Sequence, residues 1–240
     1  MPRLVLGDAR RLVSLRVGCY CLAAACSPHD LSEDRLSSSD MDELAHGAAS
    51  LVRPDRLWSR AEVLGRRSPV PAVAGAYAWY FKQLPAAIDT TRCVTWSELT
   101  LLYVGISPKA PPASGMGASR QNLRRRLRQH YALNAYGSTL RLTLGCLLAE
   151  QLGIELRRVG SGRRLTFADG EARLSQWMAE NAFVCWVAHE RPWELEDALL
   201  KTLDLPLNLQ GNDQHPFRHH LKSVRFAARD QARALPGWPR

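Results

Sequence analysis

The chain has 240 residues, of which 46% are hydrophobic, 23% charged and 8% aromatic. This composition is typical of a globular domain with a substantial core, and it excludes a collagen, a coiled-coil rod and a wholly disordered chain. Lysine and arginine number 32 against 23 acidic residues, a net charge of +9, so nucleic acid is the favoured partner and an anionic membrane surface the second.

The N-terminal part of the chain differs in composition from the rest. Residues 27–50 are polar, acidic and Ser-rich, and we expect residues 1–50 to form an extension that is disordered or a linker. The cysteines form no C-x-x-C pair, which favours thiols in a reducing compartment and therefore a cytoplasmic protein. Residues 10–26 have a basic start and an apolar middle, so export is the alternative. No run of 18 uninterrupted apolar residues occurs, and we expect no membrane-spanning helix and no membrane partner.

Helices and strands are predicted from residue 55 onward, so we place one domain at residues 55–235. Residues 55–64 have apolar residues at helical spacing. We expect strands at 73–81, 99–106 and 182–189, a loop at 107–118, and helices at 120–133, 139–152, 171–180, 192–203 and 216–234. Two short runs at 154–158 and 163–167 flank Gly160 and predict a hairpin. The fold class is therefore α+β, with a small sheet flanked by helices.

Several short motifs follow one another along this domain. The tripeptide GAY at 75–77 lies in the first strand, and YVG at 103–105 ends the second. Asn122 and Leu123 open a basic helix, and Glu196 precedes Asn208 by twelve residues. Each motif is common by itself, but in this order they resemble the GIY-YIG endonuclease superfamily over residues 71–212.

The resemblance implies a fold, an activity and a set of site residues. It implies a small antiparallel three-stranded sheet flanked by helices, with a hairpin insertion and a C-terminal helix as additions here. It also implies a metal-dependent endonuclease that hydrolyses DNA phosphodiester bonds, in duplex or branched DNA, with Mg²⁺ or alternatively Mn²⁺ as cofactor. The catalytic residues that it assigns are Tyr77, Tyr103, Arg126, His130 and Glu196, with Glu196 as the metal ligand. The substrate-binding residues that it assigns are Gly105, Arg124, Arg125 and Asn208.

The sequence departs from the family pattern in its spacing and at one position. The two tyrosines lie 26 residues apart, and Arg126 follows Tyr103 by 23 residues; both separations exceed what is usual in the family. The additional residues fall in polar or Pro-, Gly- and Ser-rich connections, where insertions are best tolerated. Ile106 stands where some members carry a lysine, and we expect Arg124 or Arg125 to supply that charge.

The chemistry of phosphodiester hydrolysis asks for these residue types independently of any family. Arg126 can form paired hydrogen bonds with two phosphate oxygens, and the single carboxylate of Glu196 suits one Mg²⁺ that keeps most of its waters. Tyr77 and Tyr103 can position a water, and one of them could deprotonate it if nearby cations lower its pKa well below about 10. Asn208 could equally cap a turn. The alternative function is a nucleic-acid-binding module of the same fold that no longer cuts, and a third is an exported or membrane-attached protein.

A second group of cations lies near the C-terminus. Basic residues recur every three or four positions and would form a stripe on one helix: Arg218, Lys222, Arg225, Arg229 and Arg233. We expect this stripe to contact DNA phosphates away from the reacting bond, so that replacing its residues would weaken binding without slowing cleavage of bound DNA.

Overall fold

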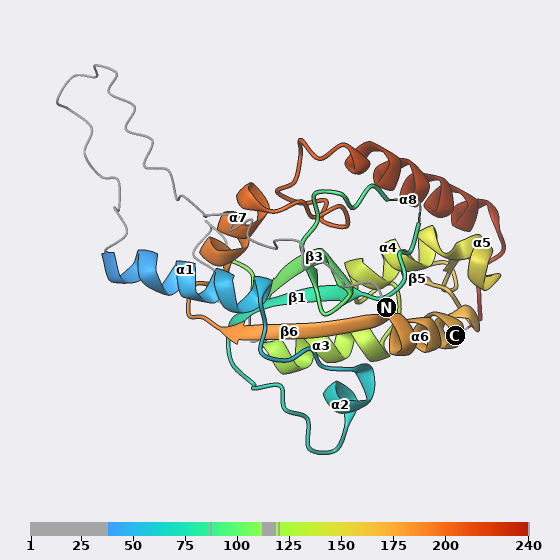
Figure 1. Ribbon diagram of the computed structural model, residues 1–240. Coiled ribbons are helices and arrows are strands. Elements are labelled where there is room, and N and C mark those ends of the chain that lie inside the picture. The colour runs from blue at the N-terminus through green and yellow to red at the C-terminus, as the bar shows by residue number, and fades with distance from the viewer. Residues whose placement is uncertain (1–37, 87, 112–118, 120, 240) are drawn as a thin grey trace, which may run out of the picture. The chain divides into compact units, whose positions relative to one another are not determined.

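The computed structural model describes residues 38–86, 88–111, 119 and 121–239. Along this part of the chain the elements are α1 (Ser38–Val52), α2 (Arg60–Leu64), β1 (Gly75–Phe81), β2 (Thr95–Trp96), β3 (Leu99–Ser107), α3 (Leu123–Ala132), α4 (Thr139–Leu147), α5 (Ala149–Leu152), β4 (Arg157–Arg158), β5 (Leu165–Thr166), α6 (Gly170–Asn181), β6 (Ala182–Ala188), α7 (Pro192–Thr202) and α8 (Phe217–Ala234) (Figure 1). The predicted α+β character is confirmed, as are the hairpin of β4 with β5 and the C-terminal helix α8. Among the helices of these residues, none is both long enough and apolar enough to cross a membrane.

An antiparallel sheet of four strands, in the order β2-β3-β1-β6, forms the centre of the described domain. The sequence predicted a three-stranded sheet, and the structure adds a fourth strand, β2. The additional strand β2 pairs with the start of β3 through a two-residue turn, in which Ser97 and Glu98 have φ angles of 48° and 64°. Turns of this kind usually carry Asn or Gly, because both central residues need positive φ. The sequence has neither at this turn, which is why β2 was not expected.

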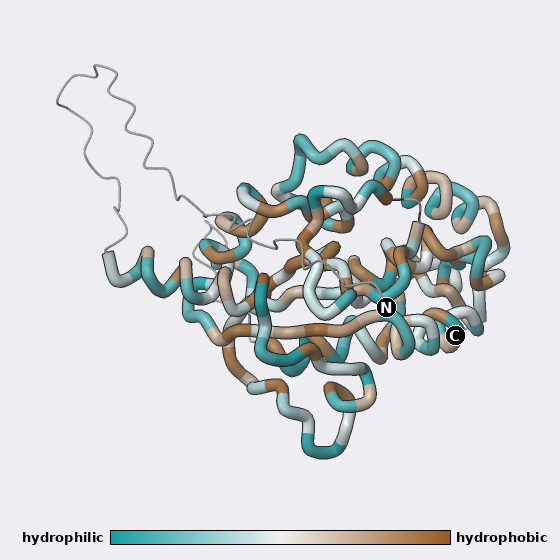
Figure 2. Tube along the Cα trace, viewed as in Figure 1, coloured by the Kyte–Doolittle hydropathy of each residue, from teal (hydrophilic) through white to brown (hydrophobic). Residues whose placement is uncertain are grey.

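The side chains of β1 alternate between two hydrophobic cores, one on each face of the sheet. Tyr77 and Trp79 pack into the core formed with α3, α4, α6 and α8. Ala78 and Tyr80 face the opposite core, which α1 and α7 cover. Figure 1 shows α1 and α7 on one side of the sheet and α3 on the other. In Figure 2 the strand β6 is largely hydrophobic, whereas long stretches of α8 are hydrophilic. A helix that packs along only one side has this mixed character.

Helix α1 corrects the expectation that residues 1–50 are an unstructured extension. Residues 38–50 belong to α1, whose Leu51 is fully buried against the sheet, while residues 1–37 lie outside the described part. The hydroxyl of Tyr80 donates to the carbonyl oxygens of Leu51 at 2.7 Å and of Val52 at 3.1 Å. Leu44, Ala48 and Leu51 lie at helical spacing among acidic and serine residues, so the apolar face was present in the sequence but diluted by polar composition.

The outer side of β6 is partly covered by a segment that precedes α2. The backbone of Trp58 exchanges two hydrogen bonds with Val184, at 2.9 and 3.0 Å. The Trp58 ring stacks on Trp186 of the same strand, with ring centroids 5.5 Å apart. Ser59 then begins α2 with a capping box that it forms with Glu62, so the helix predicted at 55–64 starts only at Arg60.

Candidate active site

The two tyrosines of the sequence motifs lie side by side on one face of the sheet. Tyr77 on β1 pairs with Gly105 on β3, and Trp79 pairs with Tyr103. Tyr77 and Tyr103 are therefore diagonal neighbours on the same face, a separation that long side chains bridge. The long connection between their strands changes nothing in this pairing, because all of it lies outside the β1–β3 register.

Gly105 makes room for the phenol of Tyr77. A Cβ atom at this position would lie 2.6 Å from the Tyr77 hydroxyl oxygen and 2.8 Å from its Cζ, closer than real Cβ contacts allow. The glycine is thus required by the cross-strand neighbour. Gly105 also lines the cavity described below, and its binding of substrate stays a prediction.

Helix α3 brings Arg126 to the tyrosines. Asn122 is the N-cap and its side chain accepts the Arg125 N–H at 3.0 Å, which fixes where the helix begins. Leu123 is fully buried and anchors the first turn. One turn later the Arg126 Nε donates to the Tyr77 hydroxyl at 3.4 Å, and its Nη1 donates to the Gly137 carbonyl at 3.3 Å. The motif of Asn and Leu therefore sets the position and rotation of Arg126.

His130 lies one turn after Arg126 and contacts Tyr77, but it does not line the cavity described below. It is fully buried; its Nε2 is 2.8 Å from the Tyr77 hydroxyl and its Nδ1 is 2.7 Å from Ser138 Oγ. Burial, with the charges of Arg126 and Arg141, lowers the pKa of His130 well below its usual value. His130 is therefore neutral at physiological pH and acts on Tyr77 through a hydrogen bond.

The pKa values of the tyrosines differ from the expectation that nearby cations would lower the pKa of one of them well below about 10. Burial raises the pKa of Tyr77 far above 10, and the neighbouring Tyr103 raises it further, while Arg126 opposes this only in part. Burial likewise raises the pKa of Tyr103. A phenolate that serves as a base in the free protein is therefore not what this site provides, and both hydroxyls are neutral.

A cavity of about 590 Å³ opens beside these residues, and Glu196 of α7 lines it. Tyr77, Tyr103 and Arg126 line the same cavity, so the four central residues of the motif converge on one space. Burial raises the pKa of Glu196 to about 7, with a further contribution from Asp197, against the opposing charges of Lys109 and Arg126. The neighbouring Leu195 is fully buried, which fixes the helix and leaves Glu196 at the edge that meets the cavity.

The donor set of this cavity fits one hard divalent cation. Glu196 is half-buried and has neither an ion pair nor a hydrogen bond among the described residues, so its carboxylate is available to a ligand. Asp197 contributes a second carboxylate to the lining. The described residues contain no group of three or more His, Cys, Asp and Glu that could enclose a metal. A single Mg²⁺ that takes most of its ligands from water and phosphate oxygens is compatible with such a set.

Asn208 fastens the segment after α7 to β3. Its Oδ1 accepts the Val104 N–H at 2.9 Å, and its Nδ2 donates to the Val104 carbonyl at 2.9 Å. The side chain is 4% exposed. Asn208 borders the cavity, but its amide is already paired with backbone, which supports the structural alternative over substrate binding.

Of the arginines predicted for the site, only Arg126 lines the cavity. Arg124 and Arg125 are exposed and do not line it, and the Arg124 Nε instead donates to the Val70 carbonyl at 2.7 Å. Lys109 and Arg225 do line it, and sequence reasoning assigned neither to the site. Lys109 lies in the predicted loop after Ile106, so it supplies the charge that Arg124 or Arg125 was expected to supply.

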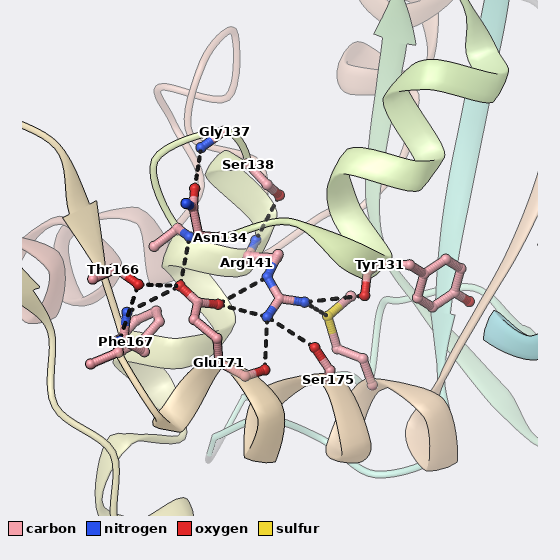
Figure 3. Close-up of polar contacts among 12 residues, drawn as sticks. Tyr131, Asn134, Gly137, Ser138, Arg141, Thr166, Phe167, Glu171 and Ser175 are labelled. Carbon is pink, nitrogen blue, oxygen red and sulfur yellow. Dashed lines mark hydrogen bonds and ion pairs between the residues drawn. The ribbon is translucent and has the colours of Figure 1, made fainter. Parts of the chain in front are cut away.

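A buried ion pair supports the helices that carry the site (Figure 3). Arg141 of α4 is fully buried, and its Nη2 donates to Glu171 Oε2 at 2.6 Å. Its Nη1 donates to the Tyr131 carbonyl at 3.3 Å and to the His130 carbonyl at 3.4 Å, at the end of α3. Glu171 Oε1 in turn accepts three hydrogen bonds from Ala135 N, Phe167 N and Thr166 Oγ1. The pair therefore joins α3, α4 and α6 directly behind His130.

Comparison with known proteins agrees with the geometry. A family model described as the GIY-YIG catalytic domain matches residues 75–227, from the first residue of β1 into α8. Because the match covers more than half of the chain, the chain belongs to this family. The family implies a nuclease. Neither a curated protein nor a solved structure was found to match the chain.

Proposed function

We propose that this protein is a metal-dependent endonuclease that hydrolyses phosphodiester bonds of DNA. The observation that carries the proposal is the convergence of Tyr77, Tyr103, Arg126 and Glu196, from four separate elements, on one cavity. Three cations, from Arg126, Lys109 and Arg225, line this cavity against two carboxylates, which suits an anionic substrate. Nucleases of the family act on DNA, which supports DNA as the partner.

Each group has a defined task at the reacting phosphate. Arg126 binds the phosphoryl oxygens and stabilises the charge that grows on them in the transition state. Glu196 would hold Mg²⁺, or alternatively Mn²⁺, which supplies Lewis-acid stabilisation of the phosphoryl and leaving oxygens when bound. Burial raises the pKa of Glu196 to about 7, so the carboxyl group is partly protonated without a cation, and a bound divalent cation would favour its anionic form.

Tyr77 and Tyr103 orient the attacking water in this proposal. With the His130 proton on Nδ1 and donated to Ser138, Nε2 accepts the Tyr77 O–H and fixes its rotation. The lone pairs of the Tyr77 oxygen are then turned towards Arg126 and the cavity, where they can accept a hydrogen bond from water. Because the pKa of Tyr77 is raised, its contribution is alignment of the water and not removal of its proton.

The alternative is a DNA-binding module that keeps the fold but does not cut. Such a module needs cations but has no use for the unpaired Glu196 carboxylate, which repels DNA phosphates. The presence of Glu196 in the same cavity as Arg126 therefore favours the enzyme. Whether the DNA is duplex or branched, and the cytoplasmic location, stay predictions.

The decisive experiment compares wild type with Glu196→Gln on supercoiled plasmid and on branched oligonucleotides, with Mg²⁺, Mn²⁺ or EDTA. Glu190→Gln is the matched control, because it makes the same charge change at an exposed residue outside the cavity. We expect cleavage by wild type and Glu190→Gln only with metal, and none by Glu196→Gln although it binds DNA at least as tightly. Cleavage by Glu196→Gln at the wild-type rate would refute the metal assignment. Binding without cleavage by wild type would favour the alternative.

A further inference from the structure

Arg225 of α8 is a buried cation that borders the cavity. Its side chain belongs to a residue only 8% exposed, and its Nη1 donates to Thr143 Oγ1 of α4 at 3.3 Å. This bond is the single hydrogen bond of its guanidinium within the part of the chain that the structure describes. None of its other nitrogens is both buried and unpartnered, so the remaining donors stay open to the cavity that Arg225 lines.

Arg141 shows how the same protein treats a buried arginine with a structural task. Arg141 belongs to α4 and Arg225 contacts it through Thr143, and both arginines are buried. Arg141 is neutralised by Glu171 and donates to several carbonyl and hydroxyl oxygens, so its guanidinium is enclosed by acceptors (Figure 3). Arg225 has no carboxylate partner among the described residues, and the charged residue of α8 that acts on its pKa is another cation, Arg229.

An uncompensated guanidinium in this position is costly for the fold. Burial and the charge of Arg229 both lower the pKa of Arg225, which means that the surroundings oppose its positive charge. A charge that is buried without a partner destabilises a protein unless a ligand supplies the opposite charge. Arginine is also the residue whose planar donors match phosphate oxygens in pairs.

The size of the cavity leaves room for more than the reacting phosphate. Its volume of about 590 Å³ lies within the range of pockets that enclose whole organic ligands, roughly 300–1,000 Å³. Arg126 enters from α3, beside Tyr77, whereas Arg225 enters from α8, beside Thr143. Two guanidinium groups from two different helices therefore line one cavity, an arrangement that suits two successive phosphates of one strand.

We propose that Arg225 binds a phosphate next to the one that is cleaved, so that the site recognises a polynucleotide strand and not an isolated phosphodiester. This inference rests on the proposed nuclease function. It also corrects the expectation for the C-terminal stripe, because Arg225 belongs to the cavity and not to a remote surface of phosphate contacts. Lys222, one turn earlier, is exposed and remains a member of such a surface.

The test pairs Arg225→Met with Lys222→Met, since each removes one positive charge from α8. We expect Arg225→Met to lose about ten-fold or more in kcat/KM on DNA, as for a lost hydrogen bond to a charged group, while Lys222→Met stays within about three-fold. A second assay uses a series of oligonucleotides, each with one neutral methylphosphonate at a different position next to the mapped cleavage site. At one of these positions the methylphosphonate should slow cleavage by wild type by a similar factor. The same methylphosphonate should not slow Arg225→Met any further. Arg225→Lys keeps the positive charge but lacks the paired donors of a guanidinium, so it should recover part of the loss in kcat/KM.

The outcomes separate this inference from the function on which it rests. If wild type cuts DNA but Arg225→Met behaves as Lys222→Met does, or every methylphosphonate slows both proteins equally, the inference is wrong and the nuclease function stands. If wild type cuts no DNA, the nuclease function fails, and the inference fails with it unless Arg225→Met alone weakens DNA binding in EDTA. The melting temperature of Arg225→Met should change little, because the hydrogen bond lost to Thr143 is offset by removal of a buried charge that has no carboxylate partner among the described residues; a steep fall would indicate a structural role and would also overturn the inference.

Discussion

Replacing Arg141 by methionine should destabilise the fold by several kilocalories per mole. Methionine keeps an unbranched side chain in the space but removes every donor that Arg141 offers. The Glu171 Oε2 then loses its cation and its two closest hydrogen bonds, from Arg141 Nε at 3.2 Å and Nη2 at 2.6 Å. The carbonyl oxygens of His130 and Tyr131 also lose a donor at the end of α3. Breaking one side of a buried ion pair typically costs about 3–5 kcal/mol.

The lower end of that range applies here, because Glu171 keeps its other partners. Its Oε1 still accepts from Ala135, Thr166 and Phe167. We therefore expect a loss of about 3 kcal/mol in the free energy of unfolding, which corresponds to a fall of about 6–12 °C in melting temperature for a domain of this size. Such a loss is a large part of the 5–15 kcal/mol that is typical of a folded domain.

Urea denaturation followed by circular dichroism measures this change, with Arg92→Met as the control. Arg92 also faces a carboxylate, Asp204, at 4.0 Å, but its side chain is 82% exposed, so its loss should stay within about 0.5 kcal/mol. The double variant Arg141→Met/Glu171→Met should recover part of the lost stability, since it leaves no unpaired charge. A loss below about 1 kcal/mol in Arg141→Met would show that the pair does not hold α3, α4 and α6 together.

Three further predictions concern the site and helix α1. The pKa of His130 is lowered on folding, so the unfolded chain binds its proton first and stability should fall as the pH drops below about 6.5, by up to about 1.4 kcal/mol per pH unit more in wild type than in His130→Gln. Parallel urea curves at pH 7.5 and pH 5.5 measure this, and an equal fall in both proteins would contradict it. Gly105→Ala should displace the Tyr77 hydroxyl and slow cleavage at least ten-fold while the protein stays folded, as single-turnover assays and circular dichroism would show; unaltered cleavage would mean that the position of Tyr77 is unimportant. Leu51→Ala should cost about 2–5 kcal/mol in urea denaturation because Leu51 is fully buried, and a neutral result would restore the view of residues 38–50 as a dispensable extension.

The motif residues could be predicted from sequence because local rules fix their geometry. Alternation along β1 and β3 places Tyr77 and Tyr103 on one face, whatever the length of the connection between the strands. Asn122 as an N-cap determines where α3 starts, so Arg126 reaches the tyrosines in spite of the unusual spacing. These relations depend on a few neighbouring residues, and the insertions leave them unchanged.

The remaining features depend on contacts between distant segments, which spacing does not reveal. The stripe on α8 was predicted from charge alone, yet Arg225 shares its helix face with the buried Leu221 and Ala232, and this spacing already placed it inward. Lys109 lies in a predicted loop, where the sequence has no hydrophobic periodicity that would indicate the direction of a side chain. The raised pKa values of Tyr77 and Tyr103 follow from burial, whereas the sequence showed only the neighbouring cations.

The backbone pairing of Trp58 with Val184 has a consequence for how copies of this chain can meet. β6 is an outermost strand, and an exposed outermost strand invites another chain to extend the sheet, which is a common route to aggregation. Trp58 occupies the hydrogen-bonding groups at the middle of β6, and the opposite end of the sheet is β2, which has only two residues. Neither margin offers a long run of free backbone. Within the described residues, a second copy that extended the sheet would therefore find only short stretches of free backbone, on either side of Val184 and along β2.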